Sequence, residues 1–321
     1  MKSIVFRKYG FPETLEFVEM KKPIPKKNEV LVKIKAVSLN AADIDWIKGK
    51  FPTRLLSPFK PAFSVLGSDI AGVVEKTGPG VSIFEAGDEI IADLSINGFG
   101  GFSEYICLNE NILRRKHKLM TFEQASTIPQ ASLMALQGLR DTVTIHDNDR
   151  VLITGAGGGI GSFAVQIAKM QGAIVTAIDS KLKHNMLLKI GVDSVIDYKQ
   201  TDFAKDINKY DIIMDLVAKH SIFSYYKVLN RGGSYIYAGG KVSTLLQAAL
   251  FGKLISKTTK KNMKFVVWKT NNEKDMDDIG HLFEQGKLDI LIDRVYEFDD
   301  TLVALKQIEG GLAKGKVVIR M

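Results

Sequence analysis

The sequence predicts an α/β protein with two domains: a β-rich, barrel-like domain and a doubly wound parallel sheet lying in the middle of the chain. Three observations support this fold class. The chain has 321 residues, a length that suits two domains better than one. Short strand patterns separated by Gly and Pro turns fill residues 1–120. From Arg150 onward, strand and helix patterns alternate.

The β-rich region is recognised by two-residue periodicity and by its turns. Glu29–Val37 alternates, with its apolar residues on one face: Val30, Val32, Ile34 and Ala36. Ile70–Lys76 runs into the turn Gly78-Pro79-Gly80, and a second turn follows at Glu85–Asp88. These closely spaced strands and turns predict an antiparallel, barrel-like fold.

The pattern becomes helical near Met120. Thr121–Gln124 is a helix cap and first turn, and it leads into a helix over Ala125–Leu139. Beyond it we expect strands at Val151–Thr154, Ile174–Ile178, Ser194–Ile196, Ile212–Leu216, Ser234–Ala238 and Lys264–Trp268, and helices at Gly161–Gln171, Lys181–Ile190 and Ile222–Leu229. Strands joined by helical crossovers predict a parallel, doubly wound sheet.

The last fifty residues continue differently. The elements expected there are a helix over Asp275–Gln285, a short strand over Arg294–Tyr296, a helix over Asp300–Glu309 and a strand over Lys316–Arg320. They add no further strand-helix-strand unit, so we expect this segment to return to the first domain. The predicted boundaries are 1–122 for the first part of the β-rich domain, 123–270 for the parallel-sheet domain and 271–321 for the return.

Composition narrows the possible functions. The net charge is +8, but the dense basic patches, Arg114–Lys118 and Lys257–Lys264, carry no interleaved aromatic residues, which favours a Lys-rich surface over a nucleic-acid interface. No apolar run is long enough to span a bilayer, and the N-terminus lacks a signal or transit pattern, so we expect a cytoplasmic protein. Cys107 is the only cysteine, which excludes an intrachain disulfide and a cysteine zinc cluster. The five histidines show no ligand spacing.

A glycine-rich turn carries the first functional signal. The strand Arg150–Thr154 is followed by Gly155-Ala-Gly-Gly-Gly-Ile-Gly161 and then by a helix. Such glycines let the backbone approach a pyrophosphate, which lies at the positive end of the following helix. A second strand ending in Asp179 completes the setting, so the sequence predicts a Rossmann domain that binds a dinucleotide.

The glycine spacing fits more than one pattern. Ile160 stands where the strict Gly-x-Gly-x-x-Gly form needs its last glycine. The spacing Gly155-x-x-Gly158-x-x-Gly161 matches medium-chain quinone reductases, and Thr154-Gly155-x-x-x-Gly159-x-Gly161 matches short-chain dehydrogenases. A short-chain enzyme needs Tyr-x-x-x-Lys on a helix, whereas Tyr237…Lys241 falls at the end of a predicted strand.

Further segments carry a resemblance that covers essentially the whole chain: Ser38–Asp43, Gly67–Gly72, Gly87–Glu89, Gly100–Tyr105, Leu136–Leu139, Val195–Tyr198 and Gly315–Val318. With them the chain resembles the zinc-independent medium-chain dehydrogenase/reductases of the quinone oxidoreductase, or zeta-crystallin-like, group. The resemblance implies a GroES-like catalytic domain, a Rossmann domain and a cofactor cleft between them. It also implies a homodimer formed through the last Rossmann strand, Lys264–Trp268.

The metal-ligand positions of related zinc alcohol dehydrogenases are changed in this chain. Those enzymes hold zinc with a Cys in the first of these segments and a His-Glu pair in the second, where this chain has Asn40, Ser68 and Asp69. An amide and a hydroxyl are poor zinc ligands, and one carboxylate does not build a tetrahedral site. We therefore expect no metal, and hydride transfer to an acceptor that is already electrophilic, a quinone or an enone.

The cofactor prediction depends on the end of the second Rossmann strand. Asp179 would favour NAD by binding the ribose 2′-hydroxyl. The resemblance implies instead that Ser180, Lys183 and Tyr198 surround the 2′-phosphate of NADPH, which is the cofactor we predict. It further implies that Asn40 lies near the nicotinamide ribose or substrate, as a positioning residue, and that Gly239, Gly240 and Lys316 lie near the cofactor. The predicted cofactor-binding set is Asn40, Gly155, Gly158, Gly159, Ile160, Gly161, Asp179, Ser180, Lys183, Tyr198, Gly239, Gly240 and Lys316, with no metal ligand.

Two other functions remain open. A dinucleotide-binding sensor or assembly protein with little turnover would have the same motifs, and a zinc alcohol dehydrogenase would be separated by metal content. Several relatives have a tyrosine where this chain has Asp45, so we expect solvent to supply the proton of the reaction. Trp46 and Phe51 are candidates for the wall of the substrate pocket, and core packing explains them equally well.

Overall fold

The computed structural model describes residues 1–50, 53–205 and 208–321, so Phe51 lies outside the described residues. The chain divides into two compact units, each described here by itself. The first unit comprises Met1–Gln130, Thr270–Glu284 and Ile292–Met321. The second comprises Ala131–Lys269 and Gln285–Leu291. The predicted α/β fold class, a β-rich and mainly antiparallel domain together with a doubly wound parallel sheet, is confirmed.

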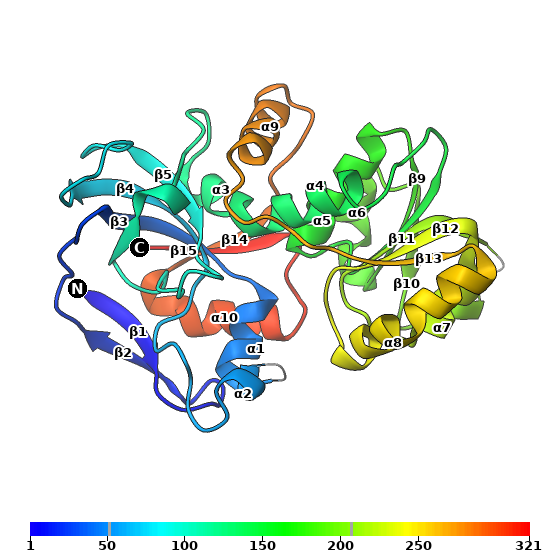
Figure 1. Ribbon diagram of the computed structural model, residues 1–321, viewed down its shortest axis with the longest axis horizontal. Coiled ribbons are helices and arrows are strands. Elements are labelled where there is room, and N and C mark those ends of the chain that lie inside the picture. The colour runs from blue at the N-terminus through cyan, green and yellow to red at the C-terminus, as the bar shows by residue number, and fades with distance from the viewer. Residues whose placement is uncertain (51–52, 206–207) are drawn as a thin grey trace. The chain divides into compact units, whose positions relative to one another are not determined.

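The first unit is built on a seven-stranded sheet (Figure 1). Its strand order is β14 (Ile292–Glu297), β15 (Lys316–Arg320), β3 (Glu29–Ser38), β4 (Asp69–Thr77), β5 (Glu89–Asp93) and β7 (Arg114–Arg115), with β6 (Tyr105–Asn109) paired to β3. The pairings are antiparallel except that of β14 with β15. β1 (Lys2–Phe6) and β2 (Leu15–Glu19) form a separate hairpin.

The centre of this unit follows the alternation read in the sequence. The four apolar residues of one face of β3 are all buried: Val30, Val32, Ile34 and Ala36. The C-terminal strand β15 pairs with β3, bringing Val318 opposite Ser38. The helices of the unit are α1 (Ala41–Lys48), α2 (Thr53–Leu56), α3 (Phe122–Ser126), α9 (Glu273–Glu284) and α10 (Thr301–Glu309). The C-terminal strand is thus part of the same sheet as β3 and β4.

The second unit contains a six-stranded parallel sheet (Figure 1). The order is β10 (Ser194–Asp197), β9 (Ile174–Asp179), β8 (Arg150–Thr154), β11 (Tyr210–Asp215), β12 (Leu229–Tyr237) and β13 (Asn262–Phe265). Successive strands run outward from β8 in one direction and from β11 in the other. The gap between the ends of β8 and β11 is therefore a topological switch point, where open α/β sheets bind their ligands.

The helices of the second unit are α4 (Leu133–Arg140), α5 (Gly159–Met170), α6 (His184–Lys189), α7 (Ile222–Val228) and α8 (Val242–Thr259). α5 packs against β8 and β9, and α8 packs against β12 and β13. No helix among the residues described is long and apolar enough to cross a membrane.

Several element boundaries were wrong. The single helix expected over Ala125–Leu139 is divided into α3, a π-helical segment (Ile128–Ser132) and α4, because Pro129 has no N–H to continue an α-helical ladder. α5 begins at Gly159 rather than Gly161, and β13 ends at Phe265 rather than Trp268. The sequence also missed α8, whose apolar residues do not form a single inward stripe: Leu246, Leu250 and Leu254 are exposed.

Candidate functional site

The glycine turn of the second unit lies at the switch point, where the loops following β8, β11 and β12 meet. Gly155 has φ +66°, and a Cβ there would lie 2.5 Å from Cγ2 of Val217. Gly240 has φ +109°, and its Cβ would lie 1.9 Å from the carbonyl oxygen of Val217. A Cβ on the neighbouring Gly239 would be 3.3 Å from the carbonyl oxygen of Leu216. These loops approach so closely that side chains at Gly155 and Gly240 would displace them.

The same turn leads into the N-terminus of α5. Gly158 is the N-cap residue, and Gly159 and Ile160 open the helix. A Cβ on Gly161 would lie 2.5 Å from the carbonyl oxygen of Gly155, so only glycine fits where the first helical turn crosses the loop. The first N–H groups of a helix have no partner within it, and they form its positive end. The turn therefore fits the pyrophosphate of a dinucleotide.

Asp179 and Lys183 are used inside the protein. Asp179 Oδ2 accepts a hydrogen bond from the backbone N of Gly157 (2.8 Å), and Oδ1 accepts one from the backbone N of Ser180 (2.8 Å). Lys183 Nζ lies 3.4 Å from Asp179 Oδ1, and both side chains are buried. A Cβ on Gly157 would lie only 2.6 Å from Cδ of Lys183, so the Lys183 side chain also packs against the glycine turn. In this arrangement the pair holds the glycine turn against the end of β9.

Ser180 and Tyr198 emerge next to each other because their strands are in register. Asp179 of β9 pairs with Asp197 of β10, so the residues that follow them leave neighbouring strand ends. The Tyr198 side chain is 43% exposed, which leaves it accessible to a ligand. The ammonium of Lys219 lies 4.4 Å from the centre of the Tyr198 ring. Sequence reasoning missed Lys219; the available signal was its place just beyond β11, the strand across the switch point from the glycine turn.

The first unit contains a buried polar cluster formed by Asn40, Ser68, Asp69 and Lys316, which we call the Lys316 cluster. Lys316 Nζ donates to Asn40 Oδ1 (2.7 Å) and to the carbonyl oxygen of Leu39 (3.2 Å), and it lies 3.6 Å from Asp69 Oδ2. Asn40 Nδ2 donates to Ser68 Oγ (3.1 Å) and to Asp69 Oδ2 (2.9 Å). Lys316 is only 2% exposed and Asp69 is fully buried, so this is an ion pair removed from water.

Burial changes the acid-base properties of the cluster. It raises the pKa of Asp69 and lowers the pKa of Lys316, and the attraction between the two groups opposes both shifts. Burial also raises the pKa of the neighbouring Asp43 to about 6, although Asp43 accepts hydrogen bonds from the backbone N–H groups of Asn40 and Gly67.

These contacts give Asn40 and Lys316 a definite placement. Both N–H bonds of the Asn40 amide have acceptors inside the cluster, and its oxygen accepts from Lys316. Ser68 and Asp69 are the other two residues that the sequence resemblance matched to zinc-ligand positions. The donor set therefore does not fit zinc: an amide, a hydroxyl and one carboxylate surround an ammonium that already supplies the positive charge.

Trp46 and Asp45, both from α1, have partners within the first unit. The Trp46 ring packs in edge contacts with Phe63 and Phe99, at 5.5 and 5.3 Å between centroids, which agrees with the core-packing reading. Asp45, at the tyrosine position of several relatives, makes an exposed ion pair with Lys50 (2.7 Å).

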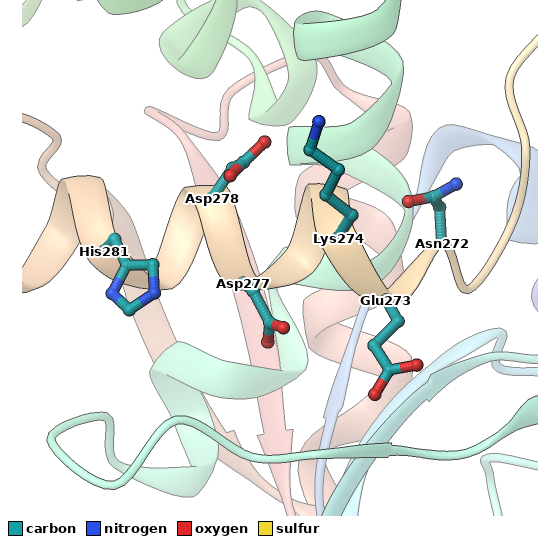
Figure 2. A pocket seen from close by; sticks show the side chains of 6 residues that line it. All are labelled: Asn272, Glu273, Lys274, Asp277, Asp278 and His281. Atoms are coloured by element: carbon teal, nitrogen blue, oxygen red, sulfur yellow. The ribbon is translucent and has the colours of Figure 1, made fainter.

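An open hollow of about 510 Å³ lies along α9 (Figure 2). Its lining is polar and consists of Asn272, Glu273, Lys274, Asp277, Asp278 and His281. None of the site residues predicted from the sequence is among them. Two of the five histidines, His117 and His281, lie together with Glu284 at this helix, although they are far apart in the sequence.

Comparison with known proteins identifies the family. Residues 26–118 match the alcohol dehydrogenase GroES-like domain, and residues 190–319 match the family described as zinc-binding dehydrogenase. The mitochondrial NAD(P)H oxidoreductase RTN4IP1 of Bos taurus is 30% identical over an alignment covering 100% of this chain and 89% of that protein. The chain belongs to the medium-chain dehydrogenase/reductase superfamily, in its quinone oxidoreductase group.

Two further relatives of this medium-chain reductase are informative. The chloroplastic NADPH-dependent alkenal/one oxidoreductase of Arabidopsis thaliana is 31% identical, with 99% of this chain and 79% of that protein covered. The quinone oxidoreductase from Coxiella burnetii has a TM-score of 0.90 at 27% identity and covers 100% of this chain and 99% of its own. The words "zinc-binding" describe the matched family, whereas Asn40, Ser68 and Asp69 lie outside that match.

Proposed function

We propose that this medium-chain reductase uses NADPH to transfer a hydride, without zinc, to a quinone or an α,β-unsaturated carbonyl compound. The observation that carries the proposal is the Lys316 cluster, in which an ammonium is bonded to Asn40 and paired with Asp69 at the zinc positions of related enzymes. Without a Lewis acid to polarise an alcohol or a simple carbonyl, the acceptor must itself be electrophilic.

Electrostatics supports the zinc-independent part of the proposal. A zinc ion held by Asn40 and Asp69 would share their oxygens with the Lys316 ammonium, which lies 2.7 Å from Asn40 Oδ1 and 3.6 Å from Asp69 Oδ2. For unit charges about 4 Å apart the repulsion is about 4 kcal/mol at an effective dielectric constant of 20, and for a dication about 8 kcal/mol. An amide and a hydroxyl have little affinity with which to offset this cost.

The NADPH part of the proposal rests on the second unit. The glycine turn and the N-terminus of α5 would receive the pyrophosphate, with Asp179 and Lys183 holding the turn in place. Ser180, Tyr198 and Lys219 would surround the 2′-phosphate, Lys219 through its charge. Because Asp179 already accepts two backbone hydrogen bonds, it is less available to a ribose hydroxyl. The names of the relatives, NAD(P)H oxidoreductase and NADPH-dependent alkenal/one oxidoreductase, support the same cofactor.

In the reaction, a bound reduced nicotinamide supplies two electrons and one hydrogen as hydride. We assign the proton that completes the reduction to solvent, because the polar groups of Asn40 and Lys316 are engaged with each other. The protein would contribute by binding and orienting both reactants and by excluding water. Asn40 and Lys316 are then positioning residues that replace a metal centre with a fixed hydrogen-bonded cluster.

We also propose a homodimer. β13 is at the edge of the six-stranded sheet, so its outer backbone groups are available for pairing with a second copy. Exposed apolar residues accompany this edge: Leu246, Leu250 and Leu254 on α8, and Val267. Pairing across a two-fold axis would cover the strand edge and these side chains together.

The test is an NADPH-oxidation screen over quinones, 2-alkenals and cyclic enones, repeated with NADH. We expect turnover with at least one acceptor class and a preference for NADPH of roughly ten- to a hundredfold, since a charge-assisted hydrogen bond to phosphate contributes about 1.5–3 kcal/mol. Tight dinucleotide binding with no turnover over the whole screen would favour the sensor or assembly function instead.

Charge reversal at one lysine tests the cofactor site. Lys219→Glu should weaken NADPH binding strongly and leave NADH binding almost unchanged. Lys261→Glu is the matched control, because the Lys261 ammonium lies 4.0 Å from the Tyr226 ring and makes a comparable contact elsewhere on the second unit. Lys183→Glu is a poorer test, since it would place a second carboxylate beside buried Asp179 and disturb the turn for both cofactors. A wild-type preference for NADH would overturn the cofactor assignment.

A further inference from the structure

Two histidines and a glutamate from distant parts of the chain meet on the first unit. His281 and Glu284 are one helical turn apart on α9, and His117 belongs to the segment between β7 and α3. His117 Nε2 lies 3.6 Å from Glu284 Oε2, and His281 Nδ1 lies 3.7 Å from the same oxygen. All three ligand atoms lie within 4.8 Å of one another.

The two separations that involve Glu284 are close to those of a metal site. Zinc binds imidazole nitrogen and carboxylate oxygen at about 2.0–2.2 Å, and tetrahedral geometry then places neighbouring ligand atoms about 3.3 Å apart. The two distances to Glu284 need to shorten by only a few tenths of an ångström to reach this value. Two imidazoles and one carboxylate are also a donor set that suits zinc, with the fourth position left to water.

The position of the His117 ring depends on Gly280. A Cβ at Gly280 would lie 2.8 Å from Cδ2 of His117, so the missing side chain makes room for the ring against α9. His117 Nδ1 is buried without a hydrogen-bond partner among the described residues, whereas Nε2 faces Glu284. Nε2 is therefore the ring nitrogen available to a metal ion.

The surroundings favour a cation. Figure 2 shows Glu273, Asp277 and His281 on one side of α9, and Lys274 on the other. Asp277 and His281 line the open hollow along the helix, which gives an ion from solution access to the His281 ring. Carboxylates beside an accessible imidazole attract divalent cations from solution.

We propose that His117, His281 and Glu284 form a zinc-binding site on the surface of the first unit. The ion would fasten α9, which belongs to the returning part of the chain, to the segment that precedes α3. This site is separate from the Lys316 cluster and takes no part in hydride transfer. Its removal should therefore leave turnover unchanged.

The test is titration of the metal-free full chain with ZnCl₂ at pH 7.5, followed by calorimetry and by competition with a fluorescent zinc chelator. We expect one zinc ion per chain with a Kd on the order of micromolar, and at least about tenfold weaker binding in His281→Ala and in Glu284→Gln. Zinc should raise the Tm of the wild type and not that of His281→Ala. His146→Ala is the matched control, because His146 also lies beside a carboxylate three residues away, Asp149, at 3.4 Å.

A second variant tests the geometry without removing a ligand. Gly280→Ala adds one methyl group against the His117 ring and improves helix propensity, so it should weaken zinc binding while leaving the metal-free protein folded. Replacing zinc by Co²⁺ should give the visible bands of a four-coordinate ion in the wild type only. Absence of binding at 100-fold above the expected Kd, or equal binding by His281→Ala, would overturn the proposal. Loss of NADPH oxidation on zinc removal would instead count against the zinc-independent mechanism.

Discussion

Replacing Lys316 by Met would remove the ammonium from the Lys316 cluster and keep most of the side-chain volume. The change leaves the carbonyl oxygen of Leu39 and Oδ1 of Asn40 without their donor, at 3.2 and 2.7 Å in the intact protein. It also leaves the carboxylate of Asp69 buried without its cation. The chain would then either keep an unpaired buried charge or take up a proton on Asp69.

The expected loss of stability depends on pH. Removing one partner of a buried ion pair costs about 3–5 kcal/mol, which is the loss we expect at pH 8. Without Lys316 the pKa of Asp69 rises further, because the group that opposed the effect of burial is gone. A carboxyl whose folded pKa is raised stabilises the fold below its unfolded pKa and loses that contribution as pH rises through the folded pKa. Lys316→Met should therefore cost less at pH 5 than at pH 8.

The assay is urea unfolding of wild type, Lys316→Met, Asp69→Asn and the double variant at both pH values. The double variant should lose at least about 2 kcal/mol less unfolding free energy than the two single variants lose together, because it leaves no buried charge unpaired. Lys50→Met is the control, since Lys50 pairs with Asp45 on the surface and should contribute less than about 1 kcal/mol. A loss below 1 kcal/mol at pH 8, equal losses at both pH values, or additive effects would refute the reasoning.

Three further predictions follow from the same structure. On a His281→Ala background, the double variant Asn40→Cys, Ser68→His should hold no zinc in the Lys316 cluster by metal analysis. Adding Lys316→Met to it should allow one zinc ion to bind there. Zinc in the variant that keeps Lys316 would contradict exclusion by the ammonium. Sedimentation should show a homodimer that Val267→Lys weakens, and a wild type that stays monomeric at all concentrations would remove the dimer proposal. Asp43→Asn should lack a pH dependence that the wild type has: burial raises the pKa of Asp43 to about 6, so its contribution to stability is present below pH 4 and lost, by about 3 kcal/mol, as pH rises through 6. Equal pH profiles in urea unfolding would contradict that assignment.

The fold could be predicted from the sequence wherever local pattern and burial agree. β3 alternates in the sequence and the predicted apolar face is buried throughout, and β15 spans the predicted residues Lys316–Arg320. α8 could not be predicted in this way. Its leucines Leu246, Leu250 and Leu254 point to solvent, while small residues such as Ala248 and Gly252 face the sheet, so the hydrophobic pattern does not mark the packed side.

The candidate site could be predicted only where it depends on backbone motifs. The glycine turn was found because close approach to Val217 and the start of α5 allow few residues other than glycine. The partners of charged side chains could not be predicted from such motifs. Asp179 stands at the expected strand end, but its carboxylate accepts a hydrogen bond from Gly157, and that contact depends on how the turn folds back. Lys219 belongs to no motif and reaches Tyr198 only through the topology of the sheet.

The absence of the usual zinc ligands is informative only together with the group that supplies positive charge in the same place, which here is Lys316. Asn40 and Ser68 alone would leave Asp69 as an uncompensated carboxylate in the interior, which a protein does not tolerate without protonation or a counter-ion. Lys316 supplies that counter-ion from the C-terminal strand β15, which pairs directly with β3 beside Asn40. In the proposed zinc-independent enzyme, the positive charge at these positions is therefore a fixed ammonium with no open coordination position. Such a group can hold the wall of a site, but it has no vacant ligand position for an alcohol oxygen. On this argument the change of ligands and the presence of Lys316 are one adaptation, which directs the proposed hydride transfer toward acceptors that are already electrophilic.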